Sequence, residues 1–528
     1  MPHNVGKTSS TPSLNVKGEQ PTSLHQVSHD NHDTNAVVVD WDGPDDSANP
    51  KNWVFRRKWA ATIVVSSFTF ITPVSSSMVA PATLQIAGEF GVTNTAIIAM
   101  MTSVFVLGFA VGPLFLGPLS EIFGRSRVLQ LANLWFFVWN LGCGFAQNKG
   151  ELIAFRLLAG LGGSAPLAVG GGVLGDVWHP EERGKAIAIY SLAPLLGPVI
   201  GPVCGAWIAE RSTWRWVFWS TSIIDAVIQF FGIFYLQESD QFNPSLAHIR
   251  SDQRFISAFA PLLLERKAAA IRKTMDAEKA QNPNVYTVFE AAGQRSWTAI
   301  FRKALTRPFL IFFREKIAQL LGVYMAFIYG LFYIFLTAMP AIYEGQYHEK
   351  TSIAGLHYIA FGVGLTLASQ VNARYMDRIY IYFKNKNNGV REPEFRLPSM
   401  VPGTIILPIG MFITGWAAQN KVHWIVTDIG IALVGGGMIL LFQSIQTYVV
   451  DTFTLHAASA LAAVSCLRSF AGFGFPLFAP AMYNSLGYGK GNTILACVAI
   501  VLGCPAPWLF WKYGKKIRMK SNYAHKSH

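Results

Sequence analysis

The stretch that decides the fold is GPLSEIFGRSR, which runs from Gly117 to Arg127 between two long apolar segments. It compresses an acid, two arginines and two glycines into the polar break between two candidate membrane spans. Glu121, Arg125 and Arg127 have the opposite charges that a reversible ion pair requires. We expect Gly117 and Gly124 to lie where two backbones pass close together. The alternative is a plain, positively charged loop at the inner membrane face.

The composition indicates a membrane protein. Of 528 residues, 51% are hydrophobic and only 14% are charged, which is too apolar for a water-soluble chain of this length. The net charge of +13 comes from bases that cluster in the gaps between apolar runs, a pattern that favours a lipid bilayer over nucleic acid as the partner. The five cysteines lie in apolar runs without a CxxC pair, so neither a disulfide framework, a metal site nor another cofactor is expected.

Twelve runs have about the 20 apolar residues that a helix needs to cross a bilayer. Six lie near 59–80, 95–117, 128–147, 152–175, 185–208 and 216–237, and six near 317–343, 353–373, 399–418, 424–448, 457–483 and 491–511. The predicted fold is therefore an all-α membrane protein with twelve transmembrane helices in two six-helix bundles. The predicted domains are a disordered tail (1–55), an N-terminal bundle (56–238), a polar linker (239–308), a C-terminal bundle (309–512) and a basic tail (513–528).

The loops after spans 2, 4, 8 and 12 hold most of the loop arginines and lysines, Arg183 and Arg374 among them. Because positive loops stay in the cytoplasm, both termini are predicted to be cytoplasmic. The chain shows no retention signal and no transit peptide, so the plasma membrane is the default location and the vacuolar membrane the alternative.

Two of the spans carry features that are costly in a membrane. Arg156 lies four residues inside span 4, and an intramembrane charge is a functional hypothesis by default; its alternative is that the side chain reaches the outer interface. Span 5 contains GPVIGPVCG, from Gly197 to Gly205, whose glycines and prolines indicate a bent helix that packs closely against a neighbour.

The order of these three motifs resembles the major facilitator superfamily, and more narrowly the twelve-span drug:proton antiporter family of fungi. SSSMVAPA, TWRWVFW and HAASALAAVSCLRSF are similar to that family too, and the resemblance covers about Val38 to Arg518. It implies a cytoplasmic gate in which Glu121 contacts span 11 and Arg125 reaches Asp176 at the end of span 4. Ile122 stands where the family usually has a base, so one contact of the gate is missing.

The resemblance also assigns roles to spans 4 and 5. Arg156 matches an arginine linked to proton transfer, although Ala159 replaces the polar residue usual three positions later. The residues that match the family's antiporter motif are Gly197, Gly201, Pro202 and Gly205.

The second half contains a weak repetition of the gate. Asp377 and Arg378 follow span 8 as Glu121 and Arg125 follow span 2, and we include both in the predicted gate. Asp451 and Arg468 are predicted near the cytoplasmic ends of spans 10 and 11, where a second latch would fit.

Proton coupling requires a membrane-embedded group whose pKa responds to its surroundings. Besides Arg156, the candidates are Asp225 in span 6, His357 in span 8 and Asp428 in span 10. Each of the last three is predicted near an outer end, so a purely interfacial role is an equal alternative.

The predicted substrate site combines aromatic rings with few polar groups. Its candidates are Tyr324, Tyr329, Tyr333, Gln443 and Gln446, in spans 7 and 10. Such a surface suits an amphipathic organic molecule better than a sugar or an inorganic ion. Tyrosines at helical spacing are equally consistent with simple packing.

We therefore predict a monomeric secondary transporter that works by alternating access and exports a drug, toxin or secondary metabolite in exchange for protons. A facilitator, or a proton symporter for an organic nutrient or polyamine, would use the same gate. A transporter-like membrane sensor is the alternative outside transport. The chain shows no nucleophile–base set and no phosphate-cradling GxxxxGK[ST] motif, so neither an enzyme nor an ATP-driven pump is expected.

Overall fold

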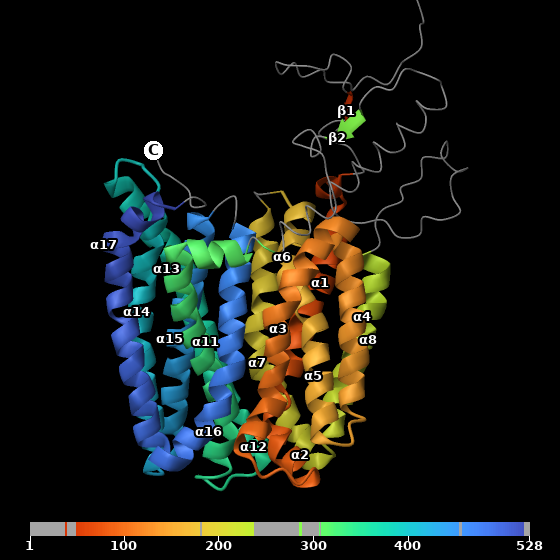
Figure 1. Ribbon diagram of the computed structural model, residues 1–528, viewed down its shortest axis with the longest axis vertical. Coiled ribbons are helices and arrows are strands. Elements are labelled where there is room, and N and C mark those ends of the chain that lie inside the picture. Colours follow the sequence, from red (N-terminus) through yellow and green to blue (C-terminus); the bar gives the residue numbers. More distant parts are fainter. Residues whose placement is uncertain are drawn as a thin grey trace, which may run out of the picture. The chain divides into compact units, whose positions relative to one another are not determined.

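The computed structural model describes residues 37–39, 49–179, 182–236, 285–287, 306, 308–453 and 457–521 (Figure 1). The chain forms two units, and the larger one, Ser47–Leu263 with Arg295–His528, contains every described helix. In the smaller unit, β1 (Val37–Val39) pairs in parallel with β2 (Val285–Thr287). Most of the predicted tail 1–55 and of the predicted linker 239–308 lies outside the described residues.

The first half of the larger unit makes six crossings, with one polar or glycine-containing break between successive helices. The crossings are α1 (Phe55–Ser77), α3 (Thr95–Phe123), α4 (Arg125–Cys143), α5 (Lys149–Gly163) continued by α6 (Ala165–Val177), α7 (Arg183–Arg211) and α8 (Arg215–Tyr235). Three short helices flank α1: η1 (Pro50–Asn52), η2 (Ala80–Ala82) and α2 (Thr83–Glu89).

The second half repeats this arrangement. Its helices are α11 (Lys316–Tyr343), α12 (Thr351–Leu356) continued by α13 (Tyr358–Lys386), η4 (Pro393–Met400), α14 (Val401–Gln419), α15 (Trp424–Thr452), α16 (Ala457–Gly503) and α17 (Pro505–Met519). Gly487 interrupts α16 with a φ of 77°, and Tyr483 and Asn492 on either side of it are hydrogen-bonded at 2.7 Å. The two arms of α16 are therefore separate crossings.

The helices confirm the predicted fold of twelve membrane helices in two bundles. Ten helices in the described part of the chain are long and apolar enough to cross a membrane, and the last of these, Ser459–Met519, includes both arms of α16. The crossing that does not reach this hydropathy is α4, which carries arginine, glutamine and asparagine side chains. Span 8 is longer than predicted: Arg374 and Arg378 lie on α13, not in a loop.

The elbow between α3 and α4 is a single residue, Gly124, whose φ of 94° favours glycine. The predicted close approach at Gly117 is wrong, because a Cβ there would meet nothing within 4 Å. The approach occurs earlier on α3, where a Cβ on Gly108 would overlap the backbone of Gly160 and one on Gly112 would overlap Ser164. Small residues thus bring α3 and α5 together.

The two bundles contact each other through α3 with α16 and through α7 with α12 and α13. The helices pack closely there. A Cβ on Gly362 of α13 would overlap Val199 of α7, and a Cβ on Gly355 of α12 would overlap Ala206 of α7. We call the end of the bundles that holds Phe55 and Met519 the terminal end, and the other end the opposite end (Figure 1). The α7–α12 contact lies toward the opposite end.

Candidate functional site

An ion pair joins the start of α4 to the end of α6 at the terminal end. Arg125 Nε lies 2.7 Å from Asp176 Oδ2, and both side chains are about four-fifths shielded. Asp176 is next to the last residue of α6, where the helix dipole disfavours an acid and the guanidinium offsets it. A Cβ on Gly172 would overlap that guanidinium. The contact expected between Arg125 and Asp176 is present; its role as a gate stays a prediction.

The gate predicted in the first half also includes Glu121 and Arg127. The side chain of Glu121 lies outside the described residues. Arg127 is half-buried, its Nε has no hydrogen-bond partner, and no ion pair links it to a described residue.

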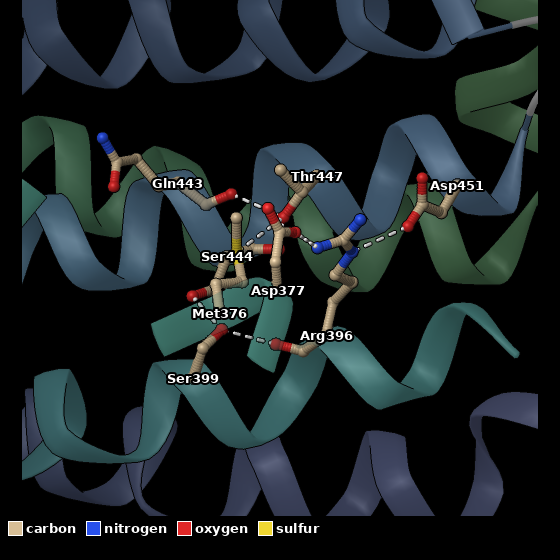
Figure 2. Close-up of polar contacts among 8 residues, drawn as sticks. All are labelled: Met376, Asp377, Arg396, Ser399, Gln443, Ser444, Thr447 and Asp451. Carbon is tan, nitrogen blue, oxygen red and sulfur yellow. Dashed lines mark hydrogen bonds and ion pairs between the residues drawn. The ribbon is translucent and has the colours of Figure 1, made fainter. Parts of the chain in front are cut away.

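The second half has its own ion-pair cluster at the terminal end (Figure 2). Arg396 of η4 lies with Nη1 2.6 Å from Asp377 Oδ1 of α13 and with Nε 3.0 Å from Asp451 Oδ2 of α15. Arg378, predicted for this place, instead stacks over the Tyr375 ring at 5.8 Å. Arg468, also predicted for a second latch, lies on α16 beside the rings of Tyr329 and Phe442.

Sequence reasoning missed Arg396, although its position carried a signal. Arg125 begins the third crossing of its half and pairs with an acid that ends the fourth. Arg396 stands just before α14, the third crossing of the second half, and Asp451 ends the fourth. Comparing positions relative to the spans, not to the motif letters, would have found it.

η4 is also tied to the end of the chain. Arg518 of α17 donates to Glu394 Oε1 at 3.0 Å, and the two side chains are 0% and 4% exposed. Lys515 pairs with Glu392 one turn away. The two buried charges compensate each other, so α17 holds η4, and with it Arg396, in place.

Arg156 is fully buried, which contradicts the interpretation that it reaches the interface. Its guanidinium donates to the carbonyls of Ser75 and Ser76 at 3.0 Å, of Thr102 at 3.0 Å and of Met101 at 3.2 Å. The Phe105 ring lies 4.8 Å away. Arg156 therefore fastens the end of α1 to the first third of α3, and no carboxylate is among its described partners.

The glycines of the antiporter motif pack α7 on α1. A Cβ on Gly197 would lie 2.7 Å from Pro73, and Cβ atoms on Gly201 and Gly205 would overlap Ser77 and Met78. On the side of α7 that faces the other bundle, the Pro202 carbonyl oxygen would lie 3.4 Å from a Cβ on Gly355. This geometry is close packing between helices, and a part in exchange stays a prediction.

A histidine between two carboxylates lies at the opposite end of the C-terminal bundle. His357 Nδ1 is 2.9 Å from both oxygens of Asp428, and Nε2 is 2.8 Å from Glu349 Oε2. The imidazole stacks on Tyr343 with centroids 3.7 Å apart, and the Tyr343 hydroxyl donates to Asp428 at 2.5 Å. The cluster joins α11, α12–α13 and α15.

Asp225 is placed differently from the prediction. It lies in the middle of α8, not near an end, and it is fully buried. Asn133 of α4 donates to its two oxygens at 3.0 and 3.2 Å. Among the described residues no cation pairs with it, so it is a membrane-embedded carboxylate held by an amide alone.

The substrate candidates separate into two groups. Tyr333 lies with its hydroxyl 3.4 Å from Ser76 Oγ of α1, so it faces the other bundle, and the tilted ring of Tyr329 lies beside it with the two centroids 5.3 Å apart. Tyr324 is buried, with its hydroxyl close to Gly503. The remaining two candidates are Gln443 and Gln446. The side chain of Gln443 accepts a hydrogen bond from Asn372 at 2.9 Å and donates one to Ser369 at 2.7 Å, whereas Gln446 is exposed.

Two six-helix bundles with paired charges at one end and a titratable cluster at the other define a multi-pass membrane transporter for a small molecule. A profile of the Major Facilitator Superfamily matches residues 65–476. The chain belongs to this superfamily, and it is a transporter, not an enzyme.

Two relatives and one solved structure illustrate the likeness. The efflux pump vrtL of Penicillium aethiopicum is 44% identical over 96% of this chain and 95% of its own length. The MFS transporter cpaT of Aspergillus oryzae is 39% identical over 97% of each chain. The crystal structure of a D-xylose-proton symporter covers 86% of this chain and 97% of its own with a TM-score of 0.61. At 16% identity this last likeness concerns the fold alone.

Proposed function

We propose that this transporter exports a small amphipathic organic compound, such as a drug, toxin or secondary metabolite, in exchange for protons. It acts as a monomer in the plasma membrane, with the terminal end in the cytoplasm. The basic residues at that end support the orientation, and the relatives named as efflux pumps support the direction of transport. The observation that carries proton exchange is the His357 cluster.

The geometry of the cluster requires a proton beyond those of a neutral imidazole. Both ring nitrogens of His357 lie within 2.9 Å of carboxylate oxygens, those of Asp428 and Glu349. A neutral imidazole donates from one nitrogen only. Either the ring is an imidazolium or one carboxyl is protonated, and loss of that proton removes one of the hydrogen bonds.

The cluster is also linked to the contact between the bundles. Ser352 of α12 donates its backbone N–H to Glu210 of α7 at 2.6 Å, across the bundle interface. His357 follows α12 directly. Tyr343 and Tyr347 are the other described titratable groups beside the two carboxylates of the cluster. Glu344 and Lys350 lie near Glu210 on the side of the α7 contact. Deprotonation loosens α12 from α15 and thereby weakens the interface that must open for release.

The test uses inside-out vesicles that contain the full chain and a panel of labelled amphipathic compounds. We expect a pH gradient, acid inside, to drive uptake of at least one compound, and collapse of the gradient to stop it. His357→Gln should abolish the gradient-driven part while exchange of labelled for unlabelled compound continues. His423→Gln, the same change at an exposed histidine, is the control. Uptake that persists without the gradient would identify a facilitator instead.

A further inference from the structure

Arg468 lies about three turns inside α16, in the segment that is long and apolar enough to cross a membrane. The helix begins at Ala457, and eleven residues at 1.5 Å each place Arg468 about 16 Å along it. The first arm of α16 runs on to Gly487, so Arg468 lies about a third of the way along it, inside the segment that is apolar enough to cross a membrane. A charge at this level is costly unless it is paired or wetted.

The partners of Arg468 are aromatic rings. Its guanidinium carbon lies 5.0 Å from the Tyr329 centroid of α11 and 5.1 Å from the Phe442 centroid of α15. Its Nε is buried without a hydrogen-bond partner, and none of the ion pairs between described residues includes it. The side chain as a whole is half-buried, and two cation–π contacts recover only part of the free energy of hydration that its shielded part loses.

The contrast with Arg156 shows what is unusual. Four of the five N–H donors of the Arg156 guanidinium are occupied by backbone carbonyls. No hydrogen bond joins the Arg468 guanidinium to another described residue, and its nearest described partners are two rings. Its fork of donors matches a planar, delocalised anion such as a carboxylate.

The surroundings of Arg468 are apolar and aromatic. Tyr329 stacks on Phe332 with an interplanar angle of 8°, and Tyr333 extends the wall toward Ser76 of α1. One turn beyond Arg468, Gly472 makes room for these rings, since a Cβ there would lie 3.0 Å from Tyr329 and 3.1 Å from Tyr333. An apolar wall with one oriented charge suits an amphipathic molecule.

We propose that Arg468 binds the anionic group of the transported compound, which makes the substrate an organic acid: a carboxylate or enolate attached to an aromatic or conjugated skeleton. The proposal rests on the proposed function and adds the chemical class of its substrate. Cationic compounds are disfavoured, because Arg468 repels them and the carboxylates of Asp377 and Asp451 are already paired with Arg396.

The test measures binding, not transport, with the purified full-length protein in detergent. The probes are matched sets of aromatic acid, primary amide and primary amine on naphthyl, biphenyl and anthracenyl skeletons, titrated by equilibrium dialysis. We expect at least one acid to bind more tightly than its amide and its amine. Arg468→Met should weaken acid binding about 10- to 100-fold, the usual worth of charged hydrogen bonds, and leave amide binding within about twofold.

Two further variants keep the result interpretable. Arg468→Lys retains the charge without the fork and should bind the acids with intermediate affinity. Arg211→Met removes an arginine that stacks on exposed Trp207 at 4.5 Å and should change nothing. Tighter binding of the amines, equal loss of acid and amide binding in Arg468→Met, or no acid binding at all would overturn the proposal. Acid binding that depends on Arg468 without proton-driven uptake would refute only the proposed exchange.

Discussion

Replacement of Arg156 by methionine tests how a buried cation holds two helices together. The change removes four hydrogen bonds of 3.0–3.2 Å. The carbonyls of Met101 and Thr102 lie within α3, where the helix itself supplies a donor. Those of Ser75 and Ser76 lie in the last turn of α1, where a helix leaves its carbonyls without partners.

The magnitude follows from these two exposed acceptors. A buried carbonyl without a partner costs about 1–3 kcal/mol, so two cost about 2–6 kcal/mol. Removing the guanidinium returns part of this, because burying a charge is itself unfavourable. We expect Arg156→Met to lower the free energy of unfolding by about 2–4 kcal/mol, and Arg156→Lys, which keeps three donors, to lower it by less.

The measurement is equilibrium unfolding of the purified protein in mixed micelles with increasing SDS, followed by tryptophan fluorescence. Arg211→Met serves as the exposed control. An unfolding free energy for Arg156→Met within about 0.5 kcal/mol of the unchanged protein would refute the reasoning. So would a fully stable variant whose transport no longer depends on pH, because Arg156 would then act on the proton and not on the helices.

Three further predictions concern the ends of the bundles. Gly172→Ala places a methyl group where the Arg125 guanidinium lies, and loss of this partly shielded pair, worth about 1 kcal/mol, should reduce vesicle uptake several-fold at unchanged abundance. Arg518→Met leaves the Glu394 carboxylate buried without compensation and should lower the unfolding free energy by about 3–5 kcal/mol in the same assay. Burial raises the pKa of the Glu344 carboxyl, so the stability of the folded protein should fall as pH rises through that raised pKa. Glu344→Gln removes the carboxyl that becomes charged. The variant should therefore unfold at a higher temperature than the unchanged protein at pH 8, and at the same temperature near pH 4.

Each of these has a matched control in the chain. Gly171→Ala adds a methyl group with nothing within 4 Å, and equal losses at positions 171 and 172 would show a general helix effect. Lys515→Met removes a base that is 55% exposed and should cost little. Parallel pH profiles for Glu344→Gln and the unchanged protein would show that the carboxyl does not titrate differently on folding.

The sequence by itself determined the twelve crossings and most of their first residues, and its resemblance to a known family implied the pairing of Arg125 with Asp176. Hydrophobic runs of membrane length report the crossings because unpaired backbone groups are excluded from lipid. The partner of Arg125 lies about fifty residues further along the chain, so it was expected only because the motif from Gly117 to Arg127 resembles that of a known family.

Only the tertiary structure decided which side chains meet across helices. It replaced Arg378 by Arg396 in the second latch, placed Asp225 at mid-membrane, and showed that Arg156 is occupied by carbonyls while Arg468 is not. These outcomes depend on helix rotation and on close approach at glycines, both of which are set by packing with neighbours far along the chain. A charge inside an apolar span of the sequence indicates that a partner is needed, but only the folded bundle shows whether a partner is present.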